Sequence, residues 1–538
     1  MNADPRAALE EARRLLGPDH VFDTPARLDP LLRNCAGITR QVPALLRPGS
    51  VDEVQELVRL AGRHGLPLYP ISRGRNWGMG SRLPVRDGTA ILDLGRLNRI
   101  REVNEEFHYA VIEPGVTQGQ LDRHLRERKL PMILNVIGSG LETSLLGNAL
   151  DRGVGYFAAR AATLSGLEVV LGTGDLLRTG FAHYPNSPLA HLNKFGVGPS
   201  LDGLFAQSNL GVVTAAGLDL IPWRDQHESV IVRIAREDQL PAVVDVLVEL
   251  RRRDLLRMIV HIGNRARTIG TLAPLVYAEL PEAQRANPAQ GRRAAEDLLA
   301  AAGFGPWSAV AGYSGTPAHL AATRRAIRTA LRGLATCVFL SDRKLAFAQR
   351  LLGALSGVLP AARRQATLLK AMAPLHGFSS GVPSDAALPS VWWTAGEIPP
   401  AQPSLDPDTS PCGLLYSLPI VPLSGRCAGQ ASELAHTISR ARGLEPLMTL
   451  NMLDDRSFEG VITLPFRTDD PAAVANAQAA LAELQQAFIA RGWLPYRVAI
   501  HEMGLVVDPQ DPYWKTIRDL KQVFDPHHIL APGRYNLV

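Results

Sequence analysis

A glycine-rich segment at residues 70–80, PISRGRNWGMG, constrains this chain more than any other stretch. Its three glycines follow the apolar run 66–71. Glycine allows a sharp turn with positive φ and has no Cβ to hold a ligand at a distance. Such a loop can direct several backbone N–H groups at one anion, and its two arginines and one asparagine add further donors, so a pyrophosphate is a natural ligand. A tight surface turn is the alternative for a glycine-rich loop taken alone.

The flanking sequence favours the ligand-binding interpretation. Residues 46–54 predict a short strand, a turn and the start of a helix that ends at Gly65, and residues 90–94 and 109–117 predict two further strands. The order of strand, helix, PLYPISRGRNWGMG, ILDLGRLNRI and VIEPGVT resembles the FAD-binding domain of the vanillyl-alcohol oxidase and p-cresol methylhydroxylase (PCMH-type) flavoprotein family. The resemblance implies FAD as the cofactor.

Two later segments extend the resemblance. Residues 137–156, which end in GNALDRGVGY, look like the family's loop on the isoalloxazine side, and residues 198–214 are similar to its segment where a strand passes the flavin. Small residues let the backbone approach a flat ring; a glycine-rich connection between strands is the alternative. The resemblance implies cofactor contacts from Arg73, Gly74, Arg75, Asn76, Trp77, Gly78, Met79, Gly80, Ser139, Gly140, Thr143, Ser144, Gly147, Asn148, Gly211, Val213 and Arg534.

Composition and charge narrow the possible functions. The formal net charge is only +5 over 538 residues, and no block of like charge is interleaved with aromatic side chains, so we expect no nucleic-acid partner. The four cysteines lack CxxC spacing, which argues against a structural zinc site and a disulfide framework. No apolar run reaches the ~18 residues of a membrane span, and the N-terminus lacks a long apolar signal region. We expect a cytoplasmic protein with no metal and no membrane partner.

The predicted fold class is α+β. The resemblance covers nearly the whole chain and implies a PCMH-type FAD-binding domain of two α/β subdomains with a cap domain over the substrate side of the flavin, and a homodimer. Strands and helices alternate in the second half, which suits an antiparallel sheet with helices on one face. The expected divisions are an N-terminal lead-in at 1–42, the FAD-binding domain at 43–223, the cap at 224–490 and a returning C-terminal segment at 491–538.

Tyr496 and Arg497 match the family's catalytic pair. In the family, hydride leaves a carbon next to an aromatic ring and reaches flavin N5. An arginine beside a tyrosine can hold a phenol as phenolate, because an opposite charge and a donated hydrogen bond both favour the anion. Loss of hydride from a 4-alkylphenolate then gives a neutral quinone methide. The alternative is a strand-edge arginine beside a packed tyrosine.

Three departures from the family pattern stand beside that match. Phenol-oxidising relatives place a second tyrosine where this chain has Met79, and an aspartate near N5 where only Glu142 could supply a carboxylate. Many relatives tether the flavin through a histidine at the position of Leu414, which has no nucleophilic atom. We therefore expect non-covalent FAD, with Cys412 and Tyr416 as the substitute tethers to be tested.

The sequence therefore predicts an FAD-dependent oxidase or dehydrogenase of a small, aromatic (4-alkylphenol-like or benzylic) substrate. The alternatives are a non-phenolic substrate such as a hydroxy acid or a biosynthetic intermediate, a noncatalytic flavin-binding protein, and a serine hydrolase. The last rests on residues 377–381, which match G-x-S-x-G around Ser379, but the flanking APLH and VPSD predict no strand before the serine and no helix after it. No nicotinamide or P-loop fingerprint occurs, and His527 and His528 have no partners at metal-ligand spacing.

Overall fold

The computed structural model describes residues 4–223, 226–400 and 405–537. Its N-terminal part contains a four-stranded sheet of order β1-β2-β4-β3, in which β2, β4 and β3 are parallel and β1 is antiparallel to β2. The strands are β1 (Val21–Phe22), β2 (Leu45–Leu46), β3 (Leu68–Ile71) and β4 (Ala90–Asp93).

Helix α3 (Val51–His64) positions the glycine-rich segment. Ser50 caps its first turn by accepting a hydrogen bond from the Glu53 N–H, and Gly65 ends it with a φ of 64°, a left-handed conformation that glycine adopts without strain. The chain then enters β3 and leaves its carboxyl end directly as the loop at residues 72–80. The local sequence thus carries this loop to one edge of the parallel strands.

A second, antiparallel sheet follows, with the order β5-β6-β10-β8-β9. Helices α4 (Gln118–Glu127) and α5 (Leu145–Leu150) contribute to its apolar core. Two short strands, β7 (Met132–Ile133) and β11 (Ile221–Pro222), form a separate pair. The five strands are β5 (Ile100–Asn104), β6 (Tyr109–Ile112), β8 (Leu164–Val170), β9 (Leu176–Arg178) and β10 (Val212–Asp219).

The second half of the chain builds an antiparallel sheet of order β15-β12-β14-β13-β18-β19-β16, and β17 also pairs with β19. One face packs against helices α6 (Leu240–Arg252), α14 (Gly425–Ala441) and α15 (Pro471–Ile489) in the largest apolar cluster. Its strands are β12 (His227–Ile234), β13 (His261–Asn264), β14 (Trp307–Ser314), β15 (Thr336–Leu340), β16 (Cys412–Ser417), β17 (Ile420–Pro422), β18 (Leu447–Met452) and β19 (Ser457–Arg467).

Helices of the second half cover both faces of that sheet. Apolar side chains of α7, α9, α12 and α13 form a separate cluster. The remaining helices are α1 (Pro5–Leu16), α2 (Pro25–Leu32), α6 (Leu240–Arg252), α7 (Arg265–Ala278), α8 (Glu282–Arg285), α9 (Pro288–Ala301), α10 (Pro317–Ala330), α11 (Asp342–Leu355), α12 (Pro360–Ser379), α13 (Pro389–Thr394), α14 (Gly425–Ala441), α15 (Pro471–Ile489) and α16 (Pro512–Phe524).

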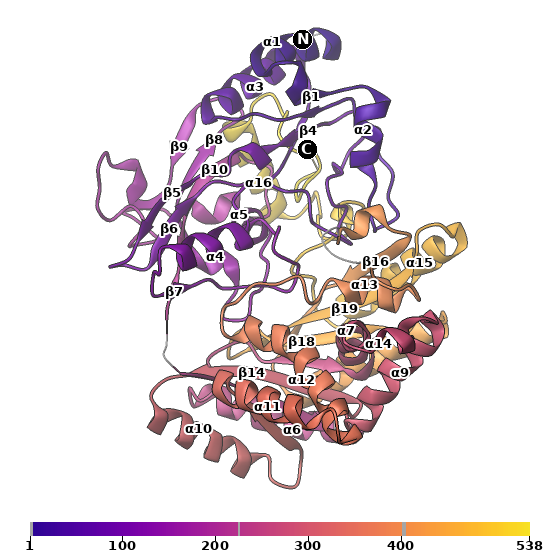
Figure 1. Cartoon of the computed structure of the whole chain (residues 1–538). Helices are drawn as coiled ribbons and strands as arrows, with labels where there is room; N and C mark the ends of the chain where they lie inside the picture. The colour runs from indigo at the N-terminus through magenta and orange to yellow at the C-terminus, as the bar shows by residue number, and fades with distance from the viewer. Residues whose placement is uncertain (1–3, 224–225, 401–404, 538) are drawn as a thin grey trace.

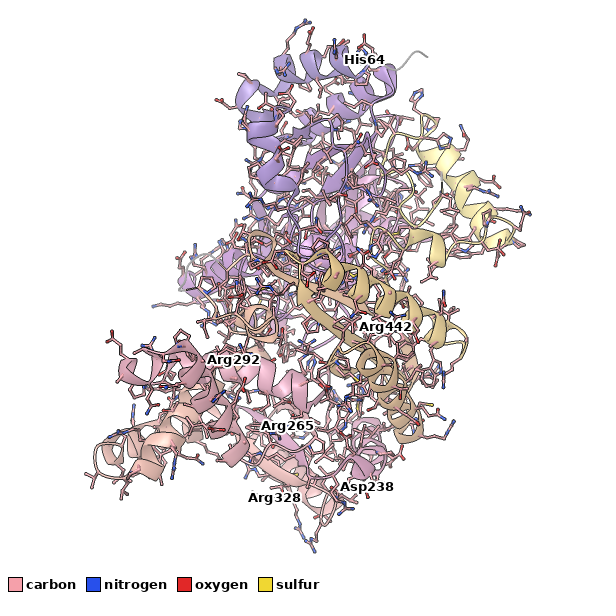
Figure 2. The ribbon with its side chains drawn as sticks, turned by 90° about the vertical axis from the view of Figure 1, so that its right-hand side faces the viewer. His64, Asp238, Arg265, Arg292, Arg328 and Arg442 are labelled. Atoms are coloured by element: carbon pink, nitrogen blue, oxygen red, sulfur yellow. The ribbon has the colours of Figure 1, made fainter. Side chains whose placement is uncertain are left out.

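The C-terminal segment returns to the first half. Figure 1 shows the yellow end of the chain among the indigo and purple elements, and Leu530 bridges Leu68 of β3 in parallel. In the view of Figure 2, His64 of α3 lies toward one end of the molecule and Arg328 of α10 toward the other. The two halves are therefore arranged end to end.

The α+β fold class predicted from sequence is confirmed. The exact domain limits at residues 43, 223 and 490 stay a prediction. The prolines between residues 399 and 411 predict a long loop, of which residues 401–404 lie outside the described residues. Among the residues that are described, no helix combines the length and apolar character needed to cross a membrane.

Candidate active site

A cavity of about 630 Å³ lies between the two halves and receives residues from both. Its first wall is formed by the two glycine-rich loops and the strand at Val213. The residues predicted to contact the cofactor that line it are Arg73, Gly74, Arg75, Asn76, Trp77, Met79, Ser139, Thr143, Ser144, Gly147, Asn148, Gly211, Val213 and Arg534.

The two loops pack closely on each other because small residues meet. The Ser144 side chain caps α5 by accepting a hydrogen bond from the Gly147 N–H at 2.9 Å. A Cβ on Gly147 would lie 2.5 Å from Ser72 Oγ of the first loop. This close approach brings the segment at 143–148 and the loop at 72–80 to the same wall of the cavity.

Three glycines predicted to contact the cofactor do not line the cavity: Gly78, Gly80 and Gly140. All three have positive φ, but their missing Cβ atoms make room for protein. At Gly78 a Cβ would collide with Leu414 and Tyr416 of β16, which belongs to the antiparallel sheet of the second half, called the cap sheet below. These glycines therefore let the loops pack against the rest of the chain, and their contact with the cofactor stays a prediction.

The predicted pair Tyr496 and Arg497 lines the cavity. Arg497 is held by an aspartate that the sequence reasoning missed: its Nη2 lies 2.8 Å from Asp151 Oδ2 and donates to Asn76 Oδ1 at 2.6 Å. Burial opposes the charge of Arg497, but the Asp151 carboxylate raises its pKa above the ordinary value. Asp151 lies in the GNALDRGVGY segment, three residues after Asn148, so its place beside the cofactor loop was the available signal.

Asp151 also binds Arg534, through an Nη2 to Oδ1 distance of 2.6 Å. The second terminal nitrogen of Arg534 donates to the Tyr69 hydroxyl at 2.8 Å. The side chains of Arg497, Asp151 and Arg534 are only 11%, 13% and 17% exposed. Two guanidinium groups share one carboxylate, so the cluster carries one net positive charge on the cavity wall.

Tyr496 is hydrogen bonded to Glu459, a second carboxylate that the sequence reasoning missed. Burial raises the pKa of Glu459 to about 7. Asn451 Nδ2 donates a hydrogen bond to Glu459 Oε2 at 3.3 Å, and Asn451 Oδ1 lies 2.7 Å from His261 Nδ1. Burial lowers the pKa of His261 to about 4, so this ring is neutral at neutral pH.

The cap sheet forms the floor of the cavity, because alternate side chains along its strands face the cavity. Side chains two residues apart on each strand point to the same face, and the residues between them, such as Val230, Ile262 and Leu450, join the apolar cluster on the opposite face. The cavity-lining residues of the sheet are Ser229, Ile231, His261, Gly263, Ser308, Val310, Leu340, Leu414, Tyr416, Thr449, Asn451, Glu459 and Val461.

Glu142, which the sequence offered as a catalytic carboxylate, does not line the cavity, and its catalytic role stays a prediction. It is 49% exposed and forms an ion pair with Arg73. Met79, by contrast, lines the cavity and packs with Leu418 and Ala499 beside Tyr496. Met79 occupies the position where phenol-oxidising relatives carry a second tyrosine. A ligand can therefore reach this position, but it meets a thioether there in place of a hydroxyl.

Ser379 does not form a nucleophile elbow. It is the last residue of α12, is 2% exposed, and donates its hydroxyl proton to the carbonyl of His376 at 2.8 Å. His227 Nε2 also lies 3.0 Å from its Oγ. A nucleophile elbow requires a strand before the serine and a helix after it, and here a helix precedes it. Within the described ranges, no group of three or more histidine, cysteine or acidic residues could hold a metal ion.

The fold and the cavity define a flavoprotein of the PCMH type, and the comparisons with known proteins agree. Residues 42–180 match the FAD binding domain family. The chain is 34% identical over 548 aligned residues to 1'-carboxy-chondrochloren decarboxylase of Chondromyces crocatus, covering 100% of this chain and 98% of that protein. It is 27% identical to the 4-cresol dehydrogenase [hydroxylating] flavoprotein subunit of Pseudomonas putida, covering 98% and 94%.

Two solved structures show the same fold. That of p-cresol methylhydroxylase with substrate bound matches with a TM-score of 0.81 at 27% identity, over 98% of this chain and 96% of that one. That of 4-ethylphenol oxidase from Gulosibacter chungangensis matches with a TM-score of 0.83 at 26% identity, over 99% and 97%. The chain belongs to the vanillyl-alcohol oxidase and p-cresol methylhydroxylase family and is an FAD-dependent oxidoreductase.

The residues of the cavity fit FAD. Both glycine-rich loops line the cavity, at Gly74 and Gly147 among other residues, and backbone N–H groups of such loops can bind a pyrophosphate. The cationic Arg497–Asp151–Arg534 cluster lies on the same wall, where a positive charge favours an electron-rich flavin ring. When bound, FAD supplies the hydride acceptor for the oxidation.

Proposed function

We propose that this enzyme oxidises a small aromatic substrate, a 4-alkylphenol-like or benzylic compound, at the carbon next to the ring. The observation that carries the proposal is the single cavity that joins the two glycine-rich loops to Tyr496 and Arg497 and to the polar floor of the cap sheet. A relative acting on 4-cresol, by its name, supports the aromatic class.

In the proposed reaction the substrate hydroxyl lies against Tyr496 and Arg497. The guanidinium favours the phenolate, since an opposite charge lowers the pKa of the phenol. The phenol proton passes through the Tyr496 hydroxyl to Glu459, whose pKa of about 7 suits proton exchange at neutral pH. Hydride then leaves the carbon next to the ring, and the electrons of the phenolate give a neutral quinone methide.

The test is anaerobic bleaching of the bound flavin by a panel of alkylphenols, benzylic alcohols, aromatic amino acids and hydroxy acids. Arg497→Ala should slow bleaching by the best aromatic substrate roughly 10²-fold, the effect of losing one partner of a developing charge. Arg467→Ala, which removes a 41% exposed arginine of β19, is the control and should leave the rate unchanged. Bleaching by hydroxy acids alone, or an unaffected Arg497→Ala variant, would contradict the proposal.

A second candidate is oxidative decarboxylation, favoured by the 34% identity over the full chain to a decarboxylase. Here hydride leaves the carbon β to a substrate carboxylate, the electrons of the C–CO₂ bond form the new C=C bond, and CO₂ departs. Carboxyl-labelled arylpropionates test this candidate. Release of labelled CO₂ at the rate of flavin bleaching would establish oxidative decarboxylation. Bleaching with the label retained in the product would show that the enzyme only dehydrogenates the substrate.

We further propose that the enzyme works in the cytoplasm as a homodimer, without a nucleic-acid or membrane partner. The balanced charge supports the absence of a nucleic-acid partner. Light scattering of the purified holoenzyme measures the mass directly, and fractionation of the producing cell locates it. A monomeric mass, or recovery with membranes, would contradict it.

A further inference from the structure

Arg267 on α7 differs from the other arginines of the cavity. Its backbone N–H is fixed by the capping side chain of Asn264 at 2.9 Å, and its side chain passes over Gly263 of β13. Nη2 donates to Thr463 Oγ1 at 2.7 Å, while Nε is buried without a hydrogen-bond partner. The guanidinium therefore ends at the cavity wall with donors left over.

No carboxylate in the described part of the chain forms an ion pair with Arg267. Arg497 and Arg534 share Asp151, and Arg73 binds Glu142. Arg75, which also lines the cavity, belongs to the glycine-rich loop assigned to the cofactor. Arg267 is thus a cation on the cap side of the cavity, and no described residue supplies a negative charge that pairs with it.

The groups around Arg267 are uncharged hydroxyls. Burial lowers the pKa of Arg267, but a guanidinium keeps its proton in proteins. Tyr156 and Tyr416 lie near enough to feel its charge, and burial raises the pKa of both phenols, that of Tyr416 to about 12. These tyrosines stay neutral, and neither hydroxyl bonds to another described residue. Arg267 is partly buried, and its Nε is fully buried. A cation in such a site without a counter-ion is costly, so the site suits an anion that enters from outside.

Resting on the proposed function, we infer that Arg267, with the hydroxyls of Tyr156 and Tyr416, binds a carboxylate on the substrate. A guanidinium holds a planar carboxylate through two parallel hydrogen bonds. Tyr416 also feels the charge of Arg497 and packs beside Tyr496. A substrate with its carboxylate at Arg267 therefore extends its aromatic end toward Tyr496 and Arg497. The substrates inferred in this way are aryl-alkyl carboxylic acids.

The experiment measures dissociation constants from changes in the flavin spectrum of the anaerobic holoenzyme. The ligands are phenyl- and 4-hydroxyphenyl-alkanoates of increasing chain length, the matching primary amides, and 4-propylphenol. The wild type should bind the best acid roughly 10–100-fold more tightly than its amide, the size of charge-assisted hydrogen bonds. Arg267→Met should abolish that preference and change the affinity for the amide less than about 3-fold, in keeping with the loss of the charge alone.

Two further variants keep the test decisive. Arg265→Met removes an exposed arginine two residues earlier on α7, which donates to the Phe304 carbonyl, and should retain the wild-type preference. If Arg267→Met does not fold, Arg267→Lys replaces it, because a lysine keeps the charge but cannot form the paired hydrogen bonds, and should weaken acid binding about 10-fold. Equal binding of acids and amides by the wild type, or a preference that survives in both Arg267 variants, would overturn the inference.

The outcomes separate this inference from the proposed function. If Arg267→Met weakens the binding of 4-propylphenol as much as the binding of the acids, the subsite holds a phenolate and the carboxylate assignment is wrong. Bleaching by 4-propylphenol as fast as by its acid, in both wild type and Arg267→Met, would leave the proposed oxidation intact while refuting the subsite. A carboxylate preference that depends on Arg267, in an enzyme that no aromatic compound bleaches, would support the subsite and refute the oxidation.

Discussion

The carboxylate of Asp151 lies 2.8 Å from the guanidinium of Arg497 and is only 13% exposed. This single aspartate fixes the arginine that we place at the substrate oxygen, and its second oxygen binds Arg534 at 2.6 Å. The position of Arg497, the proposed substrate anchor, therefore depends on Asp151. One ion-pair network, formed by Asp151 with Arg497 and Arg534, joins the cofactor side of the cavity to the proposed substrate anchor.

Asp151→Asn should destabilise the protein and slow flavin reduction. It leaves two largely buried guanidinium groups without a counter-charge, and breaking a buried pair costs roughly 3–5 kcal/mol. We expect a lower urea midpoint, together with slower anaerobic bleaching because Arg497 loses its fixed position. Glu142→Gln is the matched control: it breaks a pair whose carboxylate is 49% exposed, and such pairs contribute roughly 0–1 kcal/mol. Equal effects of the two substitutions would contradict the assigned role of Asp151.

Gly78→Val should reduce both FAD content and stability. Gly78 has a φ of 73°, and any Cβ there collides with Leu414 and Tyr416, so the loop must leave the cap strand. Because the adjoining residues Arg75 to Trp77 line the cavity, the cofactor wall moves with it. The ratio of flavin to protein absorbance measures occupancy. Gly88→Val, at a glycine with similar φ and open space around it, controls for backbone strain alone, and equal losses would refute the packing argument.

Stability should fall as pH rises between about 5 and 7, through Glu459 and Glu502. Burial raises the pKa of each to about 7 from an ordinary 4.5. The folded protein then binds more protons than the unfolded chain in this window, so folding is favoured below it and weakened as the carboxyls ionise. One such group changes the free energy of unfolding by up to about 1.4 kcal/mol per pH unit.

Urea midpoints at pH 5, 6, 7 and 8 measure this slope. Glu459→Gln should flatten it, because the amide does not titrate, and should also remove a transition near pH 7 from the rate of flavin reduction. Glu483→Gln, at a carboxylate that is 49% exposed in a surface pair, should leave the slope as it is. A Glu459→Gln slope equal to that of the wild type would show that this carboxyl is ionised throughout.

FAD should be bound without a covalent bond. Leu414 lines the cavity at the position where relatives carry a histidine tether, and Cys412 does not line it. Acid precipitation should give a white pellet and a yellow supernatant. A yellow pellet that fluoresces on a denaturing gel, and turns white in the Tyr416→Phe variant, would identify Tyr416, which does line the cavity, as a tether and refute the prediction.

The sequence by itself determined the fold class, the cofactor and the main walls of the site. Glycines at residues 74–80, the cap and stop of α3, and the strands around them are local features, because each depends on the conformational freedom and hydrogen bonding of near neighbours. The strict order of these segments was enough to reveal the family. Tyr496 and Arg497 were predicted in the same way, from a short motif, and both line the cavity.

Only the tertiary structure decided which charges meet. The Arg534–Asp151 bond joins residues 383 positions apart, and Arg497 and Asn76 are 421 apart. Glu459 and Arg267 reach the cavity through the register of β19 and the packing of α7, which no local pattern fixes. The same reason accounts for Gly78, Gly80 and Gly140, whose neighbours are distant side chains, and for Glu142, which pairs with Arg73 outside the cavity. Charge pairing and close packing depend on distance in space, and a single sequence records only distance along the chain.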